Sequence, residues 1–373
     1  MIWRVARYPL LLLAAALIAA SCGSTDAVDE TAAPAVSTTE AASASPDADH
    51  SESPITEASD DATTAGEAGS SFPITIEHVY GETVIEAAPK RVATVAWANH
   101  EVPLALGVVP VGMAKATWGD DDGDGIMPWV EARLDELGAE TPVLFDETDG
   151  IDFEAVANTG PDVILASYSG LTQEDFDTLS QIAPTIPYPE VAWGTSVHDM
   201  IAINAEAMGM ADEGAALIAE LEAIVAEAFS GHAELEGKKV VFSYIDPADT
   251  SQIGFYTTHD TRPGFLMELG IQTPDVVAER SAGTEAFYDT ISAEQADLFA
   301  DADVFVAYGD ESTLAALQAD PLIGSIPAIA NGAVAVLENS TPLAASANPS
   351  PLSIPWNIDD YFSLLAAAAA NAG

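Results

Sequence analysis

The sequence predicts an α/β protein built from two lobes, each with a mainly parallel β-sheet, joined by a long α-helix. Short apolar runs rich in β-branched residues alternate with helical stretches, which is typical of parallel sheets covered by helices on both faces. A central stretch lacks strand patterns and has the apolar spacing of a helix. The two halves also share short sequence echoes, which favours two related α/β lobes.

The N-terminus has the pattern of an export signal. Arg4 and Arg7 precede an apolar run at 9–20, which is shorter than the roughly 20 residues that span a bilayer. Cys22 follows, and a cysteine at this position resembles a bacterial lipobox, in which the thiol receives a lipid. That pattern usually has Leu three residues earlier, where this chain has Ala19. The alternative is an ordinary signal with an incidental cysteine; as the only cysteine, Cys22 can form no internal disulfide.

Composition limits the classes of function. The chain has 60 Asp and Glu against 10 Lys and Arg, a formal net charge of −50. This charge argues against nucleic acid as a partner, because phosphates need basic clusters, and against docking of the folded part on anionic lipid headgroups. Residues 23–71 contain no Lys, Arg or aromatic residue, and we expect them to form a disordered acidic tether with a reach of about 40 Å.

The folded part is expected to begin at Phe72, with a β-hairpin around Tyr80 and Gly81. Apolar strands are then predicted at 91–97, 108–113, 162–168, 239–245, 303–308 and 333–337. The predicted domains are a signal peptide (1–21), a lipidated cysteine with its tether (22–71), an N-terminal lobe (72–194), a linking helical region (195–232) and a C-terminal lobe (233–373).

The linking region is predicted from an apolar stripe within 211–229. Its members recur at helical spacing: Leu217, Leu221, Ile224, Val225 and Ala228. The stripe predicts a long helix between the lobes, although a helix internal to one domain would have the same spacing.

The echoes between the halves place matching residues in matching units. Residues 151–168 parallel residues 291–308, with Glu154 and Glu294 four positions into each unit and a strand ending in Tyr. A second echo runs from His100 to Val108 and from His259 to Ile271. Two related lobes would face each other across a cleft lined by loops at the strand ends, where open α/β sheets place ligands.

Enzyme signatures are missing from the sequence. We find no nucleophile elbow, no phosphate-binding glycine loop, no dinucleotide fingerprint and no H-E-x-x-H motif. His100 and His259 could contribute to a transition-metal site with an acidic partner, but loop histidines are more often simply solvated.

Aromatic residues fall where the cleft loops are expected, and such side chains form rigid walls for a bulky organic ligand. About half of the set should contact ligand and the rest should pack in the core. Arg262, in the stretch HDTRPGF, is the best polar candidate, because its guanidinium can hold a carboxylate, hydroxamate or carbonyl oxygen; the alternative is a structural ion pair. The full set is Trp97, Trp118, Tyr168, Trp193, Phe255, Tyr256, Phe287, Tyr308 and Trp356.

The acidic segment DDDGDGIMPWVE fits the spacing of a calcium loop. Its ligands would be Asp120, Asp122, Asp124, the carbonyl of Ile126 and Glu131. The preceding segment favours strand and turn, so a paired helix–loop–helix is not expected. An acidic surface turn that starts a helix through about Leu137 is the default interpretation.

Four segments carry a resemblance to the iron–siderophore class of bacterial solute-binding lipoproteins. They are FPITIEHVYGETVIEAAPKRVATVAW, PDVILASYSGLTQEDFDTLSQIAPTIPY, FLMELGI and SAEQADLFADADVFVAYG. The resemblance covers essentially Phe72 to the C-terminus. It implies the class III periplasmic-binding-protein fold, in which two Rossmann-like lobes joined by a long helix hold a ferric siderophore.

The resemblance implies delivery rather than catalysis. The expected ligand-binding residues are Trp97, Trp118, Tyr168, Ser169, Trp193, Tyr256, Arg262, Tyr308 and Trp356. Iron would arrive within the ligand, so we expect no cofactor of the protein's own. Glu154 and Glu294 occupy the positions whose carboxylates meet arginines of an ABC permease in this family, although solvated glutamates at helix starts would look the same.

We therefore expect a monomeric, exported protein, anchored by lipid on the outer face of the cytoplasmic membrane, that captures a ferric siderophore. A neutral or cationic hydroxamate type is favoured, because a chain of charge −50 should disfavour an anionic ferric catecholate. The alternatives are binding of cobalamin, haem or free zinc or manganese, and a tethered extracellular hydrolase.

Overall fold

The computed structural model describes residues 71–246 and 249–373, which all belong to one compact unit. The predicted signal, Cys22 and the tether up to residue 70 lie outside these residues. None of the helices in the described ranges is long and apolar enough to cross a bilayer.

The N-terminal lobe begins with a hairpin of β1 (Ile74–His78) and β2 (Gly81–Ile85), which are antiparallel, as predicted. Its sheet is parallel throughout, in the order β5-β4-β3-β6-β7. The strands are β3 (Val92–Thr94), β4 (Gly112–Ala114), β5 (Val143–Phe145), β6 (Val163–Leu165) and β7 (Thr185–Ile186); the helices are α1 (Glu101–Ala105), α2 (Pro128–Leu137), α3 (Phe153–Asn158) and α4 (Gln173–Leu179).

The C-terminal lobe contains a sheet in the order β10-β9-β8-β11-β12. Its strands are β8 (Val240–Tyr244), β9 (Gln252–Tyr256), β10 (Tyr288–Ser292), β11 (Val304–Gly309) and β12 (Val334–Glu338). The helices are α7 (Thr261–Glu268), α8 (Asp275–Ser281), η2 (Ala293–Phe299), α9 (Thr313–Ala319), η3 (Ile323–Ser325), α10 (Pro327–Asn331), α11 (Pro342–Ser346) and α12 (Ser353–Ala369).

Both sheets have the same strand order when their strands are numbered within each lobe, namely third, second, first, fourth, fifth. They differ at the second strand of the C-terminal lobe, because β9 is antiparallel to β8 and to β10. The sequence echo of 151–168 and 291–308 corresponds to α3–β6 and η2–β11, the segment that leads into the fourth strand of each sheet. This shared topology confirms the predicted class of two α/β lobes with mainly parallel sheets.

The segment between the sheets contains α5 (Val197–Ala207), α6 (Ala211–Ser230) and η1 (Ala233–Leu235), and α6 is the long helix predicted at 211–229. The break between α5 and α6 occurs at Gly209, which has φ +74°. Gly214 lets α6 approach α5 closely, since a Cβ there would lie 2.5 Å from Cβ of Ala205. Of the predicted stripe, Leu221 and Val225 are buried, and the other members are partly buried and pack against the hydrophobic core.

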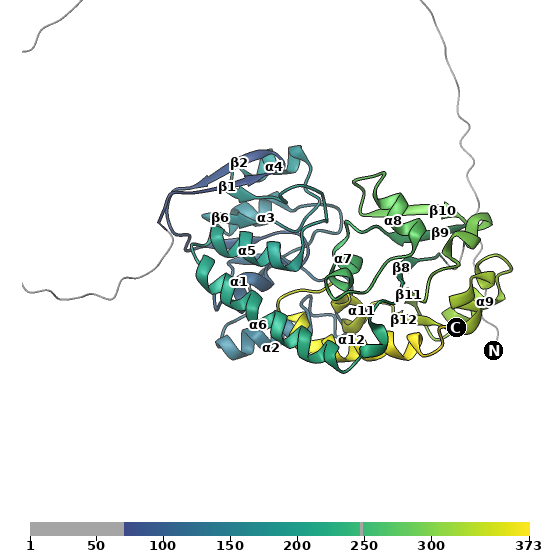
Figure 1. Cartoon of the computed structure of the whole chain (residues 1–373). Coiled ribbons are helices and arrows are strands. Elements are labelled where there is room, and N and C mark those ends of the chain that lie inside the picture. Colours follow the sequence, from purple (N-terminus) through teal and green to yellow (C-terminus); the bar gives the residue numbers. More distant parts are fainter. Residues whose placement is uncertain (1–70, 247–248) are drawn as a thin grey trace, which may run out of the picture. The chain divides into compact units, whose positions relative to one another are not determined.

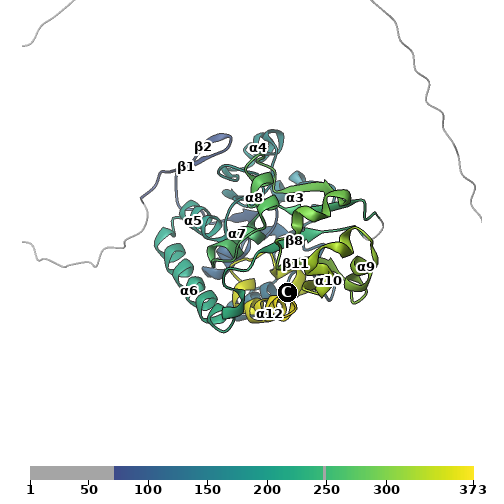
Figure 2. The same ribbon diagram turned by 45° about the vertical axis from the view of Figure 1, so that its right-hand side comes forward.

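Helix α12 lies beside α6, and together they connect the two lobes (Figures 1 and 2). Its Tyr361, Phe362 and Leu365 belong to a hydrophobic core that also contains β3 and β6 side chains of the first sheet and β8 and β11 side chains of the second. The lobes therefore share one core along these helices.

The sequence missed several short strands. β5 and β7 are three and two residues long, and β9 and β10 carry Gly254, Asp289 and Thr290, which weaken the apolar pattern. Val79 and Val84 of the predicted hairpin are exposed, whereas His78 and Thr83 are buried and share a hydrogen bond of 2.9 Å. Two of the buried positions of the hairpin are thus occupied by polar residues, which hydropathy alone does not predict.

Candidate functional site

A cleft of about 250 Å³ lies between the two sheets. Trp97, Trp118, Tyr168 and Trp193 follow β3, β4, β6 and β7, so the N-terminal lobe contributes the carboxyl ends of its parallel strands. Tyr308, the second-last residue of β11, lines the cleft from the other lobe. The remaining lining residues are Asp260, Arg262, Phe287, Ala345 and Asn348.

The aromatic walls touch one another edge to face. Trp118 and Tyr308 come from different lobes and their ring centroids lie 5.5 Å apart, at an interplanar angle of 80°. Tyr168 and Trp193 lie 5.4 Å apart at 79°. These geometries favour aromatic attraction and give the cleft rigid, largely apolar walls.

Arg262 lies at the start of α7, in the floor of the cleft. Its Nη1 donates to both carboxylate oxygens of Asp260, at 3.2 and 3.0 Å, and its guanidinium lies 4.1 Å from the ring centroid of Tyr256. Asp260 is also the N-cap of α7, because its carboxylate accepts from the backbone N–H of Arg262. Burial raises the pKa of Asp260 to about 6, against the opposing effect of the Arg262 guanidinium.

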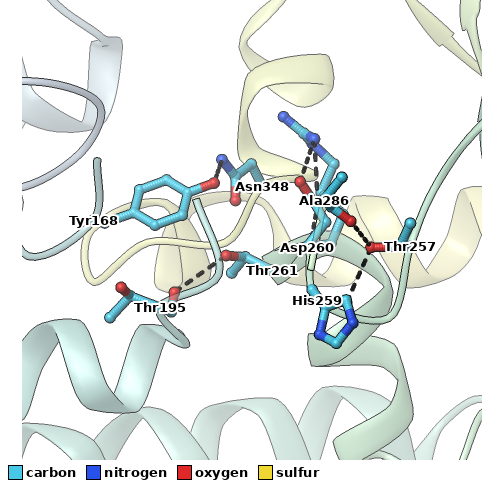
Figure 3. A network of polar contacts seen from close by, with 9 residues as sticks. Tyr168, Thr195, Thr257, His259, Asp260, Thr261, Ala286 and Asn348 are labelled. Carbon is cyan, nitrogen blue, oxygen red and sulfur yellow. Dashed lines mark hydrogen bonds and ion pairs between the residues drawn. The ribbon is translucent and has the colours of Figure 1, made fainter. Parts of the chain in front are cut away.

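Two polar atoms in the cleft lining have no partner among the described residues. They are Nε of Arg262, a donor, and Oδ1 of Asn348, an acceptor, and both are buried. The amide nitrogen of Asn348 donates to the hydroxyl of Tyr168 at 2.9 Å, as Figure 3 shows. The cleft lining therefore contains one donor and one acceptor whose hydrogen bonds a ligand or an ordered water could supply.

Hydrogen bonds from two threonine hydroxyls to backbone carbonyls fix the start of α7 and the segment before it. The Thr261 hydroxyl donates to the carbonyl of Thr195 at 3.2 Å, and the Thr257 hydroxyl donates to the carbonyl of Ala286 at 2.7 Å (Figure 3). Because Thr195 lies between β7 and α5, the first of these bonds joins the segment that leaves the N-terminal sheet to the start of α7.

Trp97 and Trp193 lie in segments of strained backbone. Ala96, Ala98 and Trp193 have φ of +61°, a left-handed conformation that is uncommon for residues with a side chain. Gly170 makes room for the Trp193 indole, since a Cβ there would lie 2.3 Å from Nε1. Such strain concentrates at ligand sites, where the surrounding structure fixes it.

A side pocket of about 190 Å³ lies behind Trp97 and Trp193, which line both hollows. It is built at the carboxyl ends of β3, β4 and β5 and contains His100, Lys115 and Glu147. Burial lowers the pKa of His100 to about 4, so its imidazole is neutral near pH 7. Burial also raises the pKa of Glu147 to about 7, although a hydrogen bond from Ala96 opposes this.

The structure brings six of the nine predicted ligand-binding residues to the cleft lining: Trp97, Trp118, Tyr168, Trp193, Arg262 and Tyr308. The other three lie outside this lining. Ser169 is fully buried behind the wall, where its carbonyl accepts from Trp193 N at 2.9 Å. Tyr256 supports Arg262 from outside the lining. Trp356 lies in α12, whose other face is in the core, and it lines a different hollow beside α6.

Other residues of the site escaped the sequence reasoning. Asp260 stands two positions before Arg262, and its place before a helix start is a recognisable N-cap signal. Phe287, one of the aromatic candidates, does line the cleft, whereas Phe255 is fully buried in the core. Asn348 lies in the irregular segment between α11 and α12 and has no local signal.

The acidic loop folds around its own backbone. Asp120 accepts from the N–H groups of Gly123 and Gly125, and Asp124 accepts from Ile126. The carboxylates of Asp120, Asp122 and Asp124 lie within 4.8 Å of one another and could hold a metal ion; Glu131 is not in this group. Helix α2 then begins at Pro128, as predicted.

His100 and His259 belong to no such cluster within the described ranges. His259 instead pairs its Nε2 with the carbonyl of Ser281 at 3.0 Å, and His100 lies in the side pocket. The two histidines line different hollows, so the sequence echo does not bring them to one site.

Glu154 and Glu294 are exposed and lie in the first turn of α3 and η2, respectively. Each of these elements leads into the fourth strand of its sheet, which runs parallel to the first strand. The connection between such strands begins at the carboxyl edge of the sheet, which is also the edge at the cleft. Both glutamates therefore lie near this edge, in the first turn of the connecting helix.

Comparison with known proteins gives consistent results. The profile of the family described as periplasmic binding protein matches residues 92–341. PiaA of Streptococcus pneumoniae TIGR4, solved in complex with ferrichrome, is 48% identical; the match covers 80% of this chain and 100% of that chain, with a TM-score of 0.78. SirA of Staphylococcus aureus, complexed with staphyloferrin B, is 22% identical over 78% of this chain and 98% of that chain, with a TM-score of 0.59, a likeness of fold alone.

A curated relative extends the comparison. The "Probable siderophore-binding lipoprotein YfiY" of Bacillus subtilis (strain 168) is 29% identical over 225 residues, or 59% of this chain. The chain spans 64% of that relative's length.

Proposed function

The chain belongs to the periplasmic binding protein family, and on that premise we propose that it captures a ferric siderophore outside the cytoplasm for uptake through an ABC permease. The observation that carries the proposal is the cleft, whose aromatic walls surround a buried arginine with an unpaired Nε. The likeness to PiaA, which was solved with ferrichrome, supports this ligand class. Proteins of this family bind and deliver ligands rather than transform them.

A hydroxamate type of siderophore fits the charge of the site. Arg262 and Asp260 are the charged residues in the cleft lining, and they neutralise each other. A neutral ferric hydroxamate such as ferrichrome would therefore enter without an uncompensated charge, and its carbonyl oxygens could accept from Arg262 Nε. An anionic ferric catecholate would meet both the net charge of −50 and a cleft without free positive charge. Iron is cargo here and needs no protein ligand.

The permease contact is assigned to Glu154 and Glu294. One exposed carboxylate per lobe, each at the carboxyl edge of its sheet, suits a partner with two matching subunits and basic pockets. Reversal of both charges should abolish transport while ligand binding remains intact. Loss of binding in the double variant would contradict this assignment.

Anchoring is assigned to Cys22, which precedes the acidic tether. A lipid there would keep a monomeric carrier beside its permease, and the lipoprotein name of the Bacillus subtilis relative supports this arrangement. Cys22→Ser protein should be released into the medium and still bind ligand. Unchanged membrane retention of this variant would contradict a lipid anchor.

The ligand class can be tested by tryptophan quenching of the purified protein. The panel contains ferrichrome, an anionic ferric catecholate, cobalamin, haem, zinc and manganese. We expect saturable quenching with ferrichrome, a large loss of affinity in Arg262→Ala, and none in Arg280→Ala, whose arginine pairs with Asp289 at the surface. Binding of the catecholate alone would contradict the hydroxamate assignment, and binding of cobalamin or haem alone would replace it.

A further inference from the structure

Glu147 lies outside the cleft lining, on the loop after β5, yet it contacts the segment that carries Trp97. Its two carboxylate oxygens lie 3.2 and 3.0 Å from the backbone nitrogen of Ala96, which donates to them. We propose that Glu147 is a positioning residue, which holds the Ala96–Trp97–Ala98 segment so that the Trp97 indole forms the wall of the siderophore cleft. This inference rests on the proposed function.

The Ala96–Ala98 segment needs external support. Ala96 and Ala98 both have φ of +61°, and no glycine relieves the strain. Trp97 lies between these two strained residues and separates the cleft from the side pocket. A tryptophan on such a segment keeps its place only while neighbouring groups hold the backbone.

Two side chains hold this segment from opposite sides. Asn99 is fully buried, and its amide donates to the carbonyls of Val95 at 2.9 Å and Trp97 at 3.3 Å. The same amide also bonds to Tyr168, so Asn99 joins the ends of β3 and β6 and belongs to the framework of the lobe. Glu147 lies in the side pocket and contacts Ala96 N. It can therefore be substituted while the bonds of Asn99 between β3 and β6 remain.

A carboxylate at this position costs folding free energy, because it is buried without a cationic partner in the described part of the chain. Glu147 is mostly buried, and within the described residues it forms no ion pair within 4.0 Å. Stability alone would favour a neutral acceptor at such a position, because burial penalises the charged form. What the carboxylate adds is a charge-assisted hydrogen bond to the strained segment, and this bond is roughly twice as strong as a neutral one.

The protonation of Glu147 gives a specific signature. Burial raises its pKa to about 7, so the carboxylate loses charge as the pH falls from 8 to 6. The other titratable groups around it are His100 and Glu101 at the start of α1, Lys115 after β4 and the neighbouring Asp146. His100 stays neutral in this range, because burial lowers its pKa to about 4. The Glu101 carboxylate accepts hydrogen bonds from Trp129 Nε1 at 2.8 Å and from the backbone nitrogen of Leu352 at 2.9 Å.

The test compares Glu147→Gln and Glu147→Ala with Asp149→Asn, an exposed carboxylate on the same loop. Ferrichrome affinity is measured at pH 8 and pH 6, and thermal unfolding reports folding. We expect the Kd of Glu147→Ala to rise about tenfold at pH 8, the effect of one lost charge-assisted hydrogen bond. Wild-type Kd should rise as the pH falls, and Asp149→Asn should follow wild type. Glu147→Gln should bind weakly at pH 8 and show a smaller rise in Kd than wild type, the part that all variants share through Asp260 of the cleft, whose pKa is about 6.

A readout without ligand separates this inference from the proposed function. Acrylamide quenching of Trp97, obtained as the difference between each protein and its Trp97→Phe version, should increase in Glu147→Ala and Glu147→Gln. Unchanged quenching together with wild-type affinity in both variants would overturn the inference. A protein that binds no ferrichrome but shows the quenching change would contradict the proposed function and leave the positioning role supported. Glu147→Gln carries the test if Glu147→Ala does not fold.

Discussion

Removal of the Arg262 guanidinium should destabilise the protein far more than removal of any surface arginine. The side chain of Asp260 is 1% exposed and that of Arg262 is 18% exposed, so Arg262→Ala leaves a carboxylate buried without its partner. Breaking a buried pair from one side costs about 3–5 kcal/mol of unfolding free energy. The folded part has about 300 residues and hence an unfolding entropy of about 0.6 kcal/mol/K, so the melting temperature should fall by about 5–8 °C.

The size of this loss should depend on pH. Asp260 already has a pKa raised to about 6 by burial, and without Arg262 that pKa should rise further, since the opposing guanidinium is gone. The folded variant can therefore bind a proton at Asp260 that the unfolded chain, with its ordinary value of 3.8, does not bind. Arg262→Ala should consequently lose less stability at pH 5 than at pH 8.

Chemical unfolding at both pH values, together with two further variants, completes this test. Asp260→Asn/Arg262→Met removes both charges and should recover most of the lost stability, because the unpaired carboxylate is gone. Arg280→Ala breaks an exposed pair and should cost about 0–1 kcal/mol. The reasoning would be refuted if Arg262→Ala stayed within about 1 kcal/mol of wild type, or if the double variant were no more stable than the single one.

Three further predictions concern other parts of the molecule. Gly170→Ala should displace the Trp193 indole and weaken ferrichrome binding about tenfold, or about 1.4 kcal/mol. The control Gly283→Ala should bind normally, because a Cβ there meets nothing closer than 3.5 Å. Equal affinities of the two variants would contradict the packing argument. The pKa of Glu147 is about 7 in the folded protein against 4.5 in the unfolded chain, so the wild type loses unfolding free energy as the pH rises from 4.5 to 7. Glu147→Gln has no such loss, so its unfolding free energy in urea should increase relative to wild type over this range. A difference between the two proteins that does not change with pH would contradict this prediction. Glu154→Arg/Glu294→Arg should bind ferrichrome normally and fail in iron uptake by cells; normal uptake would exclude the assigned contact.

Regular parts of the fold were predictable because their patterns are strong. β8, β11 and β12 are long apolar runs, and α6 repeats its buried residues at helical spacing. The shared strand order could be anticipated from the echo around Glu154 and Glu294, because both segments lead into fourth strands. β7 has two residues, and β9 reverses direction through its pairing with β8, which no local pattern specifies.

The site was predictable where chemistry and position coincide at strand ends. Trp97, Trp118, Tyr168 and Tyr308 follow recognisable strands or turns, so the topology places them at one cleft. Trp356 has the same chemistry, but the direction in which its helix faces follows from tertiary packing alone. Asn348 and Glu147 could not be found, because their roles depend on contacts with residues far away in the sequence, Tyr168 and Ala96.

The most direct test of the account is the affinity of the purified protein for ferrichrome measured against an anionic ferric catecholate of similar size. The cleft pairs its charges internally, so the account predicts saturable, one-to-one binding of ferrichrome that Arg262→Ala weakens strongly, with much weaker binding of the catecholate. Preferential binding of the catecholate, or ferrichrome binding that is unaffected by the loss of Arg262, would contradict the account.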